Sequence, residues 1–267
     1  MFKTRLISGI ILVLVIIVLF VIGGPLLWAG MAAISTIGLI EFYKAVRVDS
    51  IIPMIMGYVA LACLYLLLLL KWEDRAVTAS TAIMIILLMG TMVFTYPRYQ
   101  LTQMAVVAFG FFYVPVMLSF IYLTRSLPHG KSLVWLIILS AWGCDTLAYC
   151  TGMLVGKHKM TPLLSPKKTI EGAIGGVLGA ALLGFLYGII LHAAAPASAA
   201  HGGWFALICA LGGIISQIGD LAASAIKRNY EIKDYGHLIP GHGGILDRFD
   251  SVIITAPIIY FLSLVLL

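Results

Sequence analysis

Residues 6–40 read LISGIILVLVIIVLFVIGGPLLWAGMAAISTIGLI, an apolar run of 35 residues without a charged side chain. A helix that crosses a bilayer needs only about 20 residues, and Gly23-Gly24-Pro25 in the middle of the run is typical of a break between helices. The run therefore predicts two membrane-spanning helices. A cleaved signal peptide is disfavoured, because residues 6–22 are longer than a typical apolar leader region and lack a small-residue cleavage site.

The composition of the whole chain agrees with a membrane protein. Of its 267 residues, 62% are hydrophobic, and only 17 Lys and Arg and 11 Asp and Glu are charged, whereas about a quarter of a soluble domain is charged. A mean hydropathy of +1.09 would leave too little polar surface for water, which excludes a soluble enzyme. We expect an all-α fold, a polytopic transmembrane helical bundle of about nine spans. After the first two, the spans are predicted at about 51–70, 76–97, 101–124, 132–155, 170–192, 204–226 and 251–267.

The four cysteines all lie inside these apolar segments. Their spacings are typical of neither a disulfide framework nor a zinc knuckle. We therefore expect buried thiols at Cys63, Cys144, Cys150 and Cys209.

Lys and Arg are distributed unevenly between the predicted loops. If the N-terminus is cytoplasmic, 13 of them lie inside and four lie outside, which is the bias that the positive-inside rule describes. The C-terminus is then outside, and the outer loop at 193–203 carries no formal charge. Topology thus accounts for the net charge of +6, and no nucleic-acid partner is expected. The inside residues are Lys3, Arg5, Lys44, Arg47, Arg98, Lys157, Lys159, Lys167, Lys168, Lys227, Arg228, Lys233 and Arg248, and the outside ones are Lys71, Arg75, Arg125 and Lys131.

The acidic residues distinguish two parts of the chain. The four acids of the first 140 residues are all at loops or span ends, and the remaining 127 residues contain seven. We therefore divide the chain into N-terminal helices, 1–131, with about five spans, and a catalytic half, 132–267, with cytoplasmic loops at 156–169 and 227–250. The four acids of the first part are Glu41, Asp49, Glu73 and Asp74.

Two carboxylates fall within predicted spans, Asp145 in the sixth apolar run and Asp220 in the eighth. An ionised carboxylate there costs at least about 2.5–3.5 kcal/mol unless it meets a partner, and such residues are functional by default. We expect a cationic group to face them. A purely structural pair with a Lys of a neighbouring helix is the alternative.

Polar side chains continue from these carboxylates along their helices. Gln217, Asp220, Ser224 and Lys227 recur at i, i+3, i+7 and i+10, which places them along one side of a helix. Asp145 and Tyr149 form a similar pair, followed by Gly152 and Gly156, which either leave room for a ligand or serve helix packing.

Residues 224–250 read SAIKRNYEIKDYGHLIPGHGGILDRFD and are the least lipid-like stretch of the chain. Glycines let backbone N–H groups approach phosphate oxygens, Lys and Arg neutralise them, and paired carboxylates bind a divalent cation. These are the parts of a phosphoryl or nucleotidyl transfer site. Two alternatives are a basic loop that rests on anionic headgroups and, for Asp247 and Asp250, simple N-terminal capping. No P-loop is present, and His237 and His242 lack further ligands for zinc.

The other basic loop carries the cluster Ser165-Pro166-Lys167-Lys168-Thr169. Its lysines suit anionic headgroups or a triphosphate, and Thr169 is placed to cap the following helix. That helix has small-xxx-small pairs, Gly172/Gly176 and Gly184/Gly188, which predict close helix packing within a subunit or across a dimer.

These residues together resemble a known family. The pattern Ser224-x-Ile226-Lys227-Arg228, then Lys233-Asp234, then Pro240-x-His242-Gly243-Gly244-Ile245-x-Asp247-Arg248-x-Asp250 is similar to the C-terminal motif of phosphatidate cytidylyltransferases, the CDP-diacylglycerol synthases. Ser165-Pro166-Lys167-Lys168-Thr169-x-Glu171-Gly172 and Asp145-x-x-Ala148-Tyr149 also match the family. The specific match covers about 140–250, and the first half is similar only in being helical and apolar.

The resemblance implies that CTP and phosphatidate react to CDP-diacylglycerol and pyrophosphate by attack of a phosphatidate oxygen on the α-phosphorus of CTP. It also implies a homodimer in a bacterial inner membrane with the active site facing the cytoplasm, and a Mg2+ ion, with or without a second, monovalent cation such as K+. For the metal we expect Asp220 and Asp247, with Asp145 and Asp250 as further members. Lys227 and Ser224 join Asp220 and Asp247 as catalytic residues. Substrate binding is assigned to Lys167, Lys168, Arg228, Lys233, His242, Gly243, Gly244 and Arg248.

Two other functions remain open on the sequence. A CTP-dependent polyprenol or lipid-alcohol kinase would use comparable membrane carboxylates but would release CDP instead of pyrophosphate. An ion-coupled secondary transporter would use Asp145 and Asp220 as ion ligands, although no inverted repeat is visible and the acids cluster with the basic loops in one half.

Overall fold

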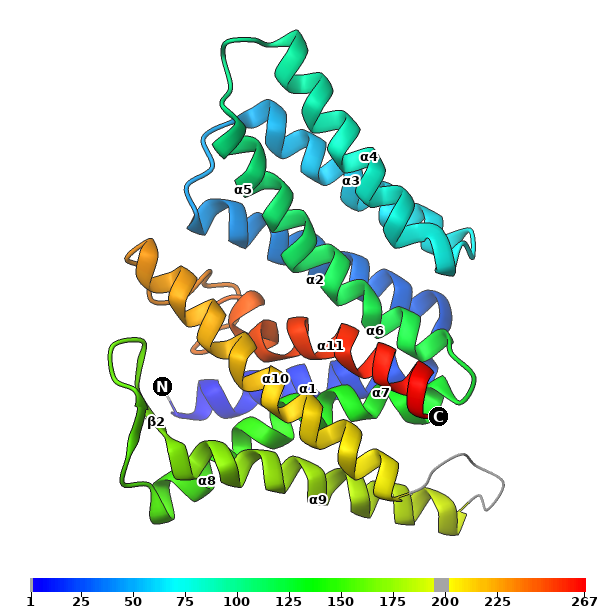
Figure 1. The fold of residues 1–267 in the computed structure, drawn as a ribbon, viewed down its shortest axis with the longest axis vertical. Coiled ribbons are helices and arrows are strands. Elements are labelled where there is room, and N and C mark those ends of the chain that lie inside the picture. Colours follow the sequence, from blue (N-terminus) through cyan, green and yellow to red (C-terminus); the bar gives the residue numbers. More distant parts are fainter. Residues whose placement is uncertain (1, 195–201) are drawn as a thin grey trace. The chain divides into compact units, whose positions relative to one another are not determined.

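The computed structural model describes residues 2–194 and 202–267, with side chains from residue 6 onward. These residues are predominantly helical (Figure 1), which confirms the all-α fold class. Most of the predicted outer loop at 193–203 lies outside the described residues, as do the side chains of Lys3 and Arg5.

Among the residues that the structure describes, eight segments are long and apolar enough to cross a membrane, and a ninth apolar helix, Leu6–Ile22, is shorter. With that shorter helix the count equals the nine expected, and the chain is an integral, multi-pass membrane protein. Two of the eight are interrupted by a π-helical turn. The helices are α1 (Phe2–Ile22), α2 (Gly24–Ala45), α3 (Ile51–Leu69), α4 (Glu73–Phe94), α5 (Leu101–Phe111) with η1 (Phe112–Val116) and α6 (Met117–Ser126), α7 (Gly130–Ile138) with η2 (Leu139–Gly143) and α8 (Cys144–Val155), α9 (Ile170–Ala194), α10 (Gly202–Asn229) and α11 (Leu246–Leu266).

The break predicted in the first apolar run is present between α1 and α2. Gly23 and Gly24 both adopt positive φ angles, 66° and 52°, a region that glycine enters without steric cost. Pro25 follows in the first turn of α2, where its missing N–H leaves no hydrogen bond unmade. The local sequence therefore accounts for the turn.

Packing divides the chain into two compact units. The first combines the residues up to Tyr122 with Ile232–Arg248, and the second combines Leu123–Glu231 with Phe249–Leu267. The predicted parts, 1–131 and 132–267, were defined by function and stay a prediction. In terms of packing, the loop before α11 belongs with the N-terminal helices.

The first unit has an aromatic core around Tyr43 of α2. Its hydroxyl group donates a hydrogen bond to the carbonyl oxygen of Val107 in α5 at 3.0 Å, and its ring packs against Tyr58 and Phe42. Gly57 faces the same ring, where a Cβ atom would overlap the hydroxyl group. Helices α2, α3 and α5 are thereby brought close together.

The second unit depends on glycines of α9. A Cβ atom at Gly176 would lie 2.9 Å from the carbonyl oxygen of Cys144 in α8, and one at Gly184 would lie 2.5 Å from that of Phe205 in α10. The small-xxx-small pattern thus gives close helix packing within the subunit. Whether it also serves a dimer stays a prediction.

Three expectations are corrected by the structure. The last helix begins at Leu246, not near 251, because Asp247 and Asp250, which suggested a loop, lie in its first turns, where acidic side chains interact favourably with the helix dipole. Part of the loop at 156–169 forms a two-stranded antiparallel sheet, β1 (Lys159–Thr161) and β2 (Ser165–Thr169). The four thiols are unpaired, but only Cys144 and Cys209 are buried, since an apolar helix of a membrane protein also has an outward face.

Candidate functional site

A lysine and an aspartate form an ion pair in the second unit. The Nζ atom of Lys168, at the end of β2, lies 2.6 Å from Oδ2 of Asp220 in α10, and each side chain is about a quarter exposed, at 25% and 28%. The cationic partner expected for Asp220 is therefore present. It comes from the basic loop, whereas the structural alternative placed it on a neighbouring helix.

Two further carboxylates lie near this ion pair. Asp145 of α8 is in electrostatic range of Asp220 and Lys168, and its carboxylate accepts a hydrogen bond from Ser251 of α11. Asp250 of α11 is in electrostatic range of Asp220, Asp145 and Lys227. Three of the four predicted metal ligands thus gather in one unit, which we call the carboxylate cluster (Asp145, Asp220 and Asp250).

The polar stripe of α10 leads to this cluster. Gln217 is buried and donates hydrogen bonds from Nε2 to the carbonyl oxygen of Ala173 at 2.9 Å and to the Cys144 sulfur at 3.3 Å. It therefore fixes α10 against α9 and α8 beside the cluster. Ser224 and Lys227 follow on the same helix and are half-buried, whereas Arg228 is exposed near the helix end.

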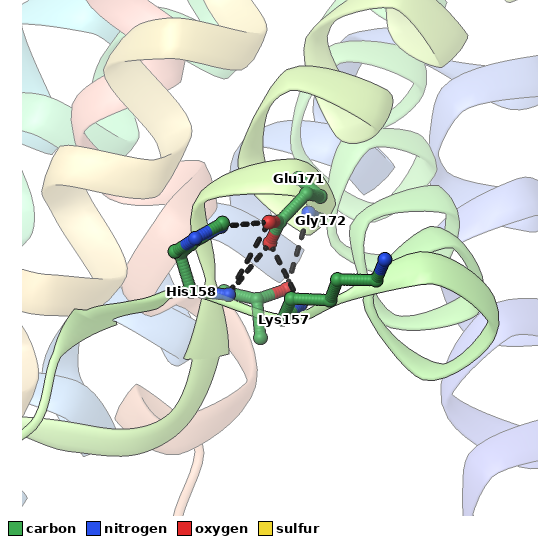
Figure 2. Close-up of polar contacts among 5 residues, drawn as sticks. Lys157, His158, Glu171 and Gly172 are labelled. Carbon is green, nitrogen blue, oxygen red and sulfur yellow. Dashed lines mark hydrogen bonds and ion pairs between the residues drawn. The ribbon is translucent and has the colours of Figure 1, made fainter.

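The hairpin that carries Lys168 is attached to the start of α9. Oγ1 of Thr169 accepts the backbone N–H of Gly172 at 3.1 Å, which confirms Thr169 as the N-cap. Figure 2 shows the Glu171 carboxylate against the backbone of Lys157 and His158, whose N–H groups donate to it at 3.1 and 3.2 Å. The Nδ1 atom of His158 lies 2.6 Å from the same carboxylate. Both ends of the hairpin are thus fixed, which sets the position of Lys168.

The side chain of Thr169 fills the space beside Gly152 and Gly156. Cβ atoms at these glycines would lie 2.9 and 2.7 Å from Oγ1 of Thr169. The packing alternative is therefore favoured over a ligand space. Tyr149, on the same helix, is exposed, and so is Lys167 on β2.

Asp247 organises the loop that precedes α11, in the first unit. The side chain is 6% exposed, and its Oδ2 accepts the backbone N–H groups of Tyr235 at 2.8 Å and Gly244 at 3.0 Å. Gly243, which precedes Gly244 in the chain, has a φ of 85°, and a Cβ atom there would lie 2.9 Å from the same oxygen. The glycines of the motif therefore let the backbone wrap around this carboxylate.

The same loop forms a polar pocket of about 500 Å³, which we call the loop pocket. Arg248 donates from Nε to the carbonyl oxygen of His242 at 3.1 Å, and His242 Nδ1 lies 2.8 Å from Oγ of Ser8 in α1. Basic side chains outnumber the one carboxylate, so the pocket suits an anionic ligand. It is lined by Lys233, Asp234, His237, Ile239, Gly241, His242, Gly243 and Arg248.

Sequence reasoning missed one residue of this region, Glu41 of α2. Its carboxylate is 7% exposed and accepts the backbone N–H groups of Ile245 at 3.1 Å and Leu246 at 2.9 Å. A Glu at the end of an apolar span is normally read as an interfacial charge. Nothing in its sequence neighbourhood indicates a partner more than 200 residues away.

The carboxylate cluster suits magnesium in the kind of ligand that it offers. In the described ranges, 2–194 and 202–267, no three His, Cys, Asp or Glu side chains converge closely enough to hold a metal by themselves. Mg2+ does not require this, because it is usually bound by one or two carboxylates together with substrate phosphates and water. Asp220, with Asp145 or Asp250 beside it, supplies oxygen ligands of that kind.

Comparison with known proteins gives a consistent assignment. The model of the cytidylyltransferase family matches residues 3–266. Proteins named phosphatidate cytidylyltransferase are similar over most of the chain: that of Bacillus subtilis is 28% identical over 97% of each sequence, and that of Staphylococcus haemolyticus is 31% identical over 97% of this chain and 98% of its own. The protein of that name from Rickettsia bellii is 37% identical over 58% of this chain and 67% of its own.

Proposed function

The chain belongs to the cytidylyltransferase family and makes CDP-diacylglycerol from CTP and phosphatidate, and we propose that it does so with the carboxylate cluster and the loop pocket. The observation that carries the assignment of the site is the Lys168–Asp220 ion pair. It brings the basic hairpin to an intramembrane carboxylate, which supports a site where basic groups bind phosphate and carboxylates bind the metal.

The reaction requires no covalent enzyme intermediate. An oxygen of the phosphatidate phosphate attacks the α-phosphorus of CTP, the bond from this phosphorus to the bridging oxygen breaks, and pyrophosphate leaves with that oxygen. In such transfers an enzyme contributes positioning and charge neutralisation. Lys168 and Lys227, beside the cluster, neutralise phosphate oxygens as charge develops on them. Ser224, one turn before Lys227 on α10, supplies a hydroxyl group for positioning.

The metal proposal rests on the donor oxygens of the cluster. Asp220, with Asp145 and Asp250, would hold Mg2+, and Asp247 stays a further candidate from the motif. A bound Mg2+ would supply charge that binds and polarises the phosphates of CTP. The family resemblance also implies a second, monovalent cation such as K+, and we include this cation in the proposal.

The loop pocket is proposed to bind phosphate groups. Lys233, His242 and Arg248 line it, and the backbone of Gly243 and Gly244 has no side chain to prevent close approach. Arg248 presents a planar guanidinium group, which matches phosphate oxygens better than an ammonium group does. Lys167 and Arg228, both exposed, are proposed as further phosphate contacts.

We also propose a setting for this enzyme. The bias of Lys and Arg supports a cytoplasmic active site, and the bacterial relatives support the inner membrane as its location. Phosphatidate would then arrive from the surrounding bilayer and CTP from the cytoplasm. A homodimer is the expected assembly of the family.

One assay tests the function and separates it from the kinase alternative. Protein purified in detergent receives CTP and phosphatidate in the presence and absence of Mg2+, and the products are identified. CDP-diacylglycerol and pyrophosphate formed only with Mg2+ support the proposal. Release of CDP would indicate a kinase, and turnover that is equal after chelation would remove the metal from the proposal.

A further inference from the structure

The helix that carries the C-terminal motif begins on a carboxylate from α2. Helix α11 starts at Leu246, and the first N–H groups of any helix have no partner within it. Here Glu41 supplies the acceptors: Oε1 accepts from Ile245 at 3.1 Å and Oε2 from Leu246 at 2.9 Å. A negative charge at this end is also favoured by the helix dipole. One distant side chain thus replaces a local N-cap.

Two glycines of the loop enclose this carboxylate. Cβ atoms at Gly236 and Gly244 would both overlap carboxylate atoms of Glu41. The loop backbone therefore closes on the side chain from two sides. This close approach is separate from the hydrogen bonds and defines the path of the loop around Glu41.

Residues of the loop pocket lie on both sides of this contact in the chain, with His242 and Gly243 before it and Arg248 after it. Asp247 and Arg248 come next in α11, and Arg248 donates a hydrogen bond to the carbonyl oxygen of His242. We propose that Glu41 is a positioning residue for the reaction: it holds the loop and the first turn of α11 in the conformation in which His242 and Arg248 line the pocket. This inference rests on the proposed function of the loop pocket.

The energetics favour this role over simple stabilisation of the fold. Burying a carboxylate is costly, and replacing buried charged groups by well-packed apolar side chains is often neutral or stabilising. A Ser or Asp immediately before α11 would have capped the helix locally. A carboxylate from another helix does more than cap, because it ties the start of α11 to α2.

Two variants perturb the contact, one by changing the carboxylate and the other by changing the loop that encloses it. Glu41→Gln keeps the shape but replaces one acceptor oxygen by an amide group, and Gly236→Ala places a methyl group against the carboxylate. Asp49→Asn, which removes an exposed carboxylate just beyond α2, is the matched control. Hydrogen exchange of the peptide that contains Ile245 and Leu246, and the KM for CTP, are measured for each.

We expect faster exchange of this peptide in both variants and a KM for CTP raised by about tenfold, within the range that a small misplacement of binding groups costs. The control should match the wild type in both measurements. A merely structural role would lower the yield of folded enzyme and leave the KM unchanged, and that result in both variants would overturn the positioning role. Unchanged exchange would overturn the contact itself.

Failure of the proposed function would look different. If the wild type forms no CDP-diacylglycerol, the function is wrong, while the exchange measurement still decides whether Glu41 holds the start of α11. If Glu41→Gln does not fold, Gly236→Ala alone decides, because it retains the carboxylate and its charge.

Discussion

The ammonium group of Lys168 lies 2.6 Å from a carboxylate oxygen of Asp220, so the last residues of a short hairpin reach into the middle of a membrane helix. A carboxylate in that position is stabilised by its cationic partner.

Replacing Asp220 by Asn should reduce CDP-diacylglycerol formation on the order of 100-fold or more, because the amide removes the charge that pairs with Lys168 and that we propose to bind a divalent cation. Asp247→Asn should also inactivate the enzyme. Membrane insertion should be unchanged in both, as measured by extraction and gel filtration. Near-normal turnover of either variant would remove that residue from the proposed metal site.

Lys168→Met should lower turnover far more than Lys159→Met, by on the order of 100-fold against little change. Both substitutions remove one positive charge from the same hairpin, but only Lys168 contacts Asp220, and Lys159 is exposed on β1. The comparison is made at saturating CTP and phosphatidate. Equal losses would mean that the hairpin acts through its net charge.

Arg248→Lys should impair turnover although the positive charge is retained. Lys cannot reproduce the planar fork of a guanidinium group, and the Nε–H that donates to the carbonyl oxygen of His242 is lost. The assay is CTP-dependent turnover in uncharged detergent, with phosphatidate as the only anionic lipid. If the loop only rests on anionic headgroups, Arg and Lys will serve equally and added salt will weaken both in parallel.

A topology experiment tests the predicted orientation. A reporter fused after Leu267 should lie outside the cytoplasm, and one inserted at Lys159 should lie inside, because the positive-inside rule places the basic hairpin in the cytoplasm. The same location for both would show that one of the three helices between them, α9, α10 or α11, does not cross the membrane.

Two glycine substitutions should have opposite effects on stability. Gly176→Ala places a Cβ atom 2.9 Å from the carbonyl oxygen of Cys144 and should cost about 1–3 kcal/mol through overpacking. At Gly90 of α4 a Cβ atom meets nothing within 4 Å, so Gly90→Ala should be neutral or stabilise by up to about 1 kcal/mol. Thermal unfolding in detergent measures both, and an unchanged melting temperature for Gly176→Ala would contradict the packing described for α9.

Local features of the sequence determined most of the architecture. The spans could be predicted from uncharged runs long enough to cross a bilayer. A charged residue is costly in lipid mainly because of its own chemistry, so its position in the sequence is informative before the fold is known. The turn at Gly23-Gly24-Pro25 and the cap at Thr169 were also predictable, since each depends on a few adjacent residues. The motif and its glycines indicated phosphate chemistry for the same reason.

Only the tertiary structure decided which charges meet. Lys168 reaches Asp220 because a hairpin, fixed by Thr169 and Glu171, returns to the helices. Glu41 holds Ile245 and Leu246 across more than 200 residues, and no periodicity links residues that far apart. The path of the chain sets such contacts, and the packing of whole helices sets that path, so a single Glu at the end of an apolar span carries no local sign of its partner.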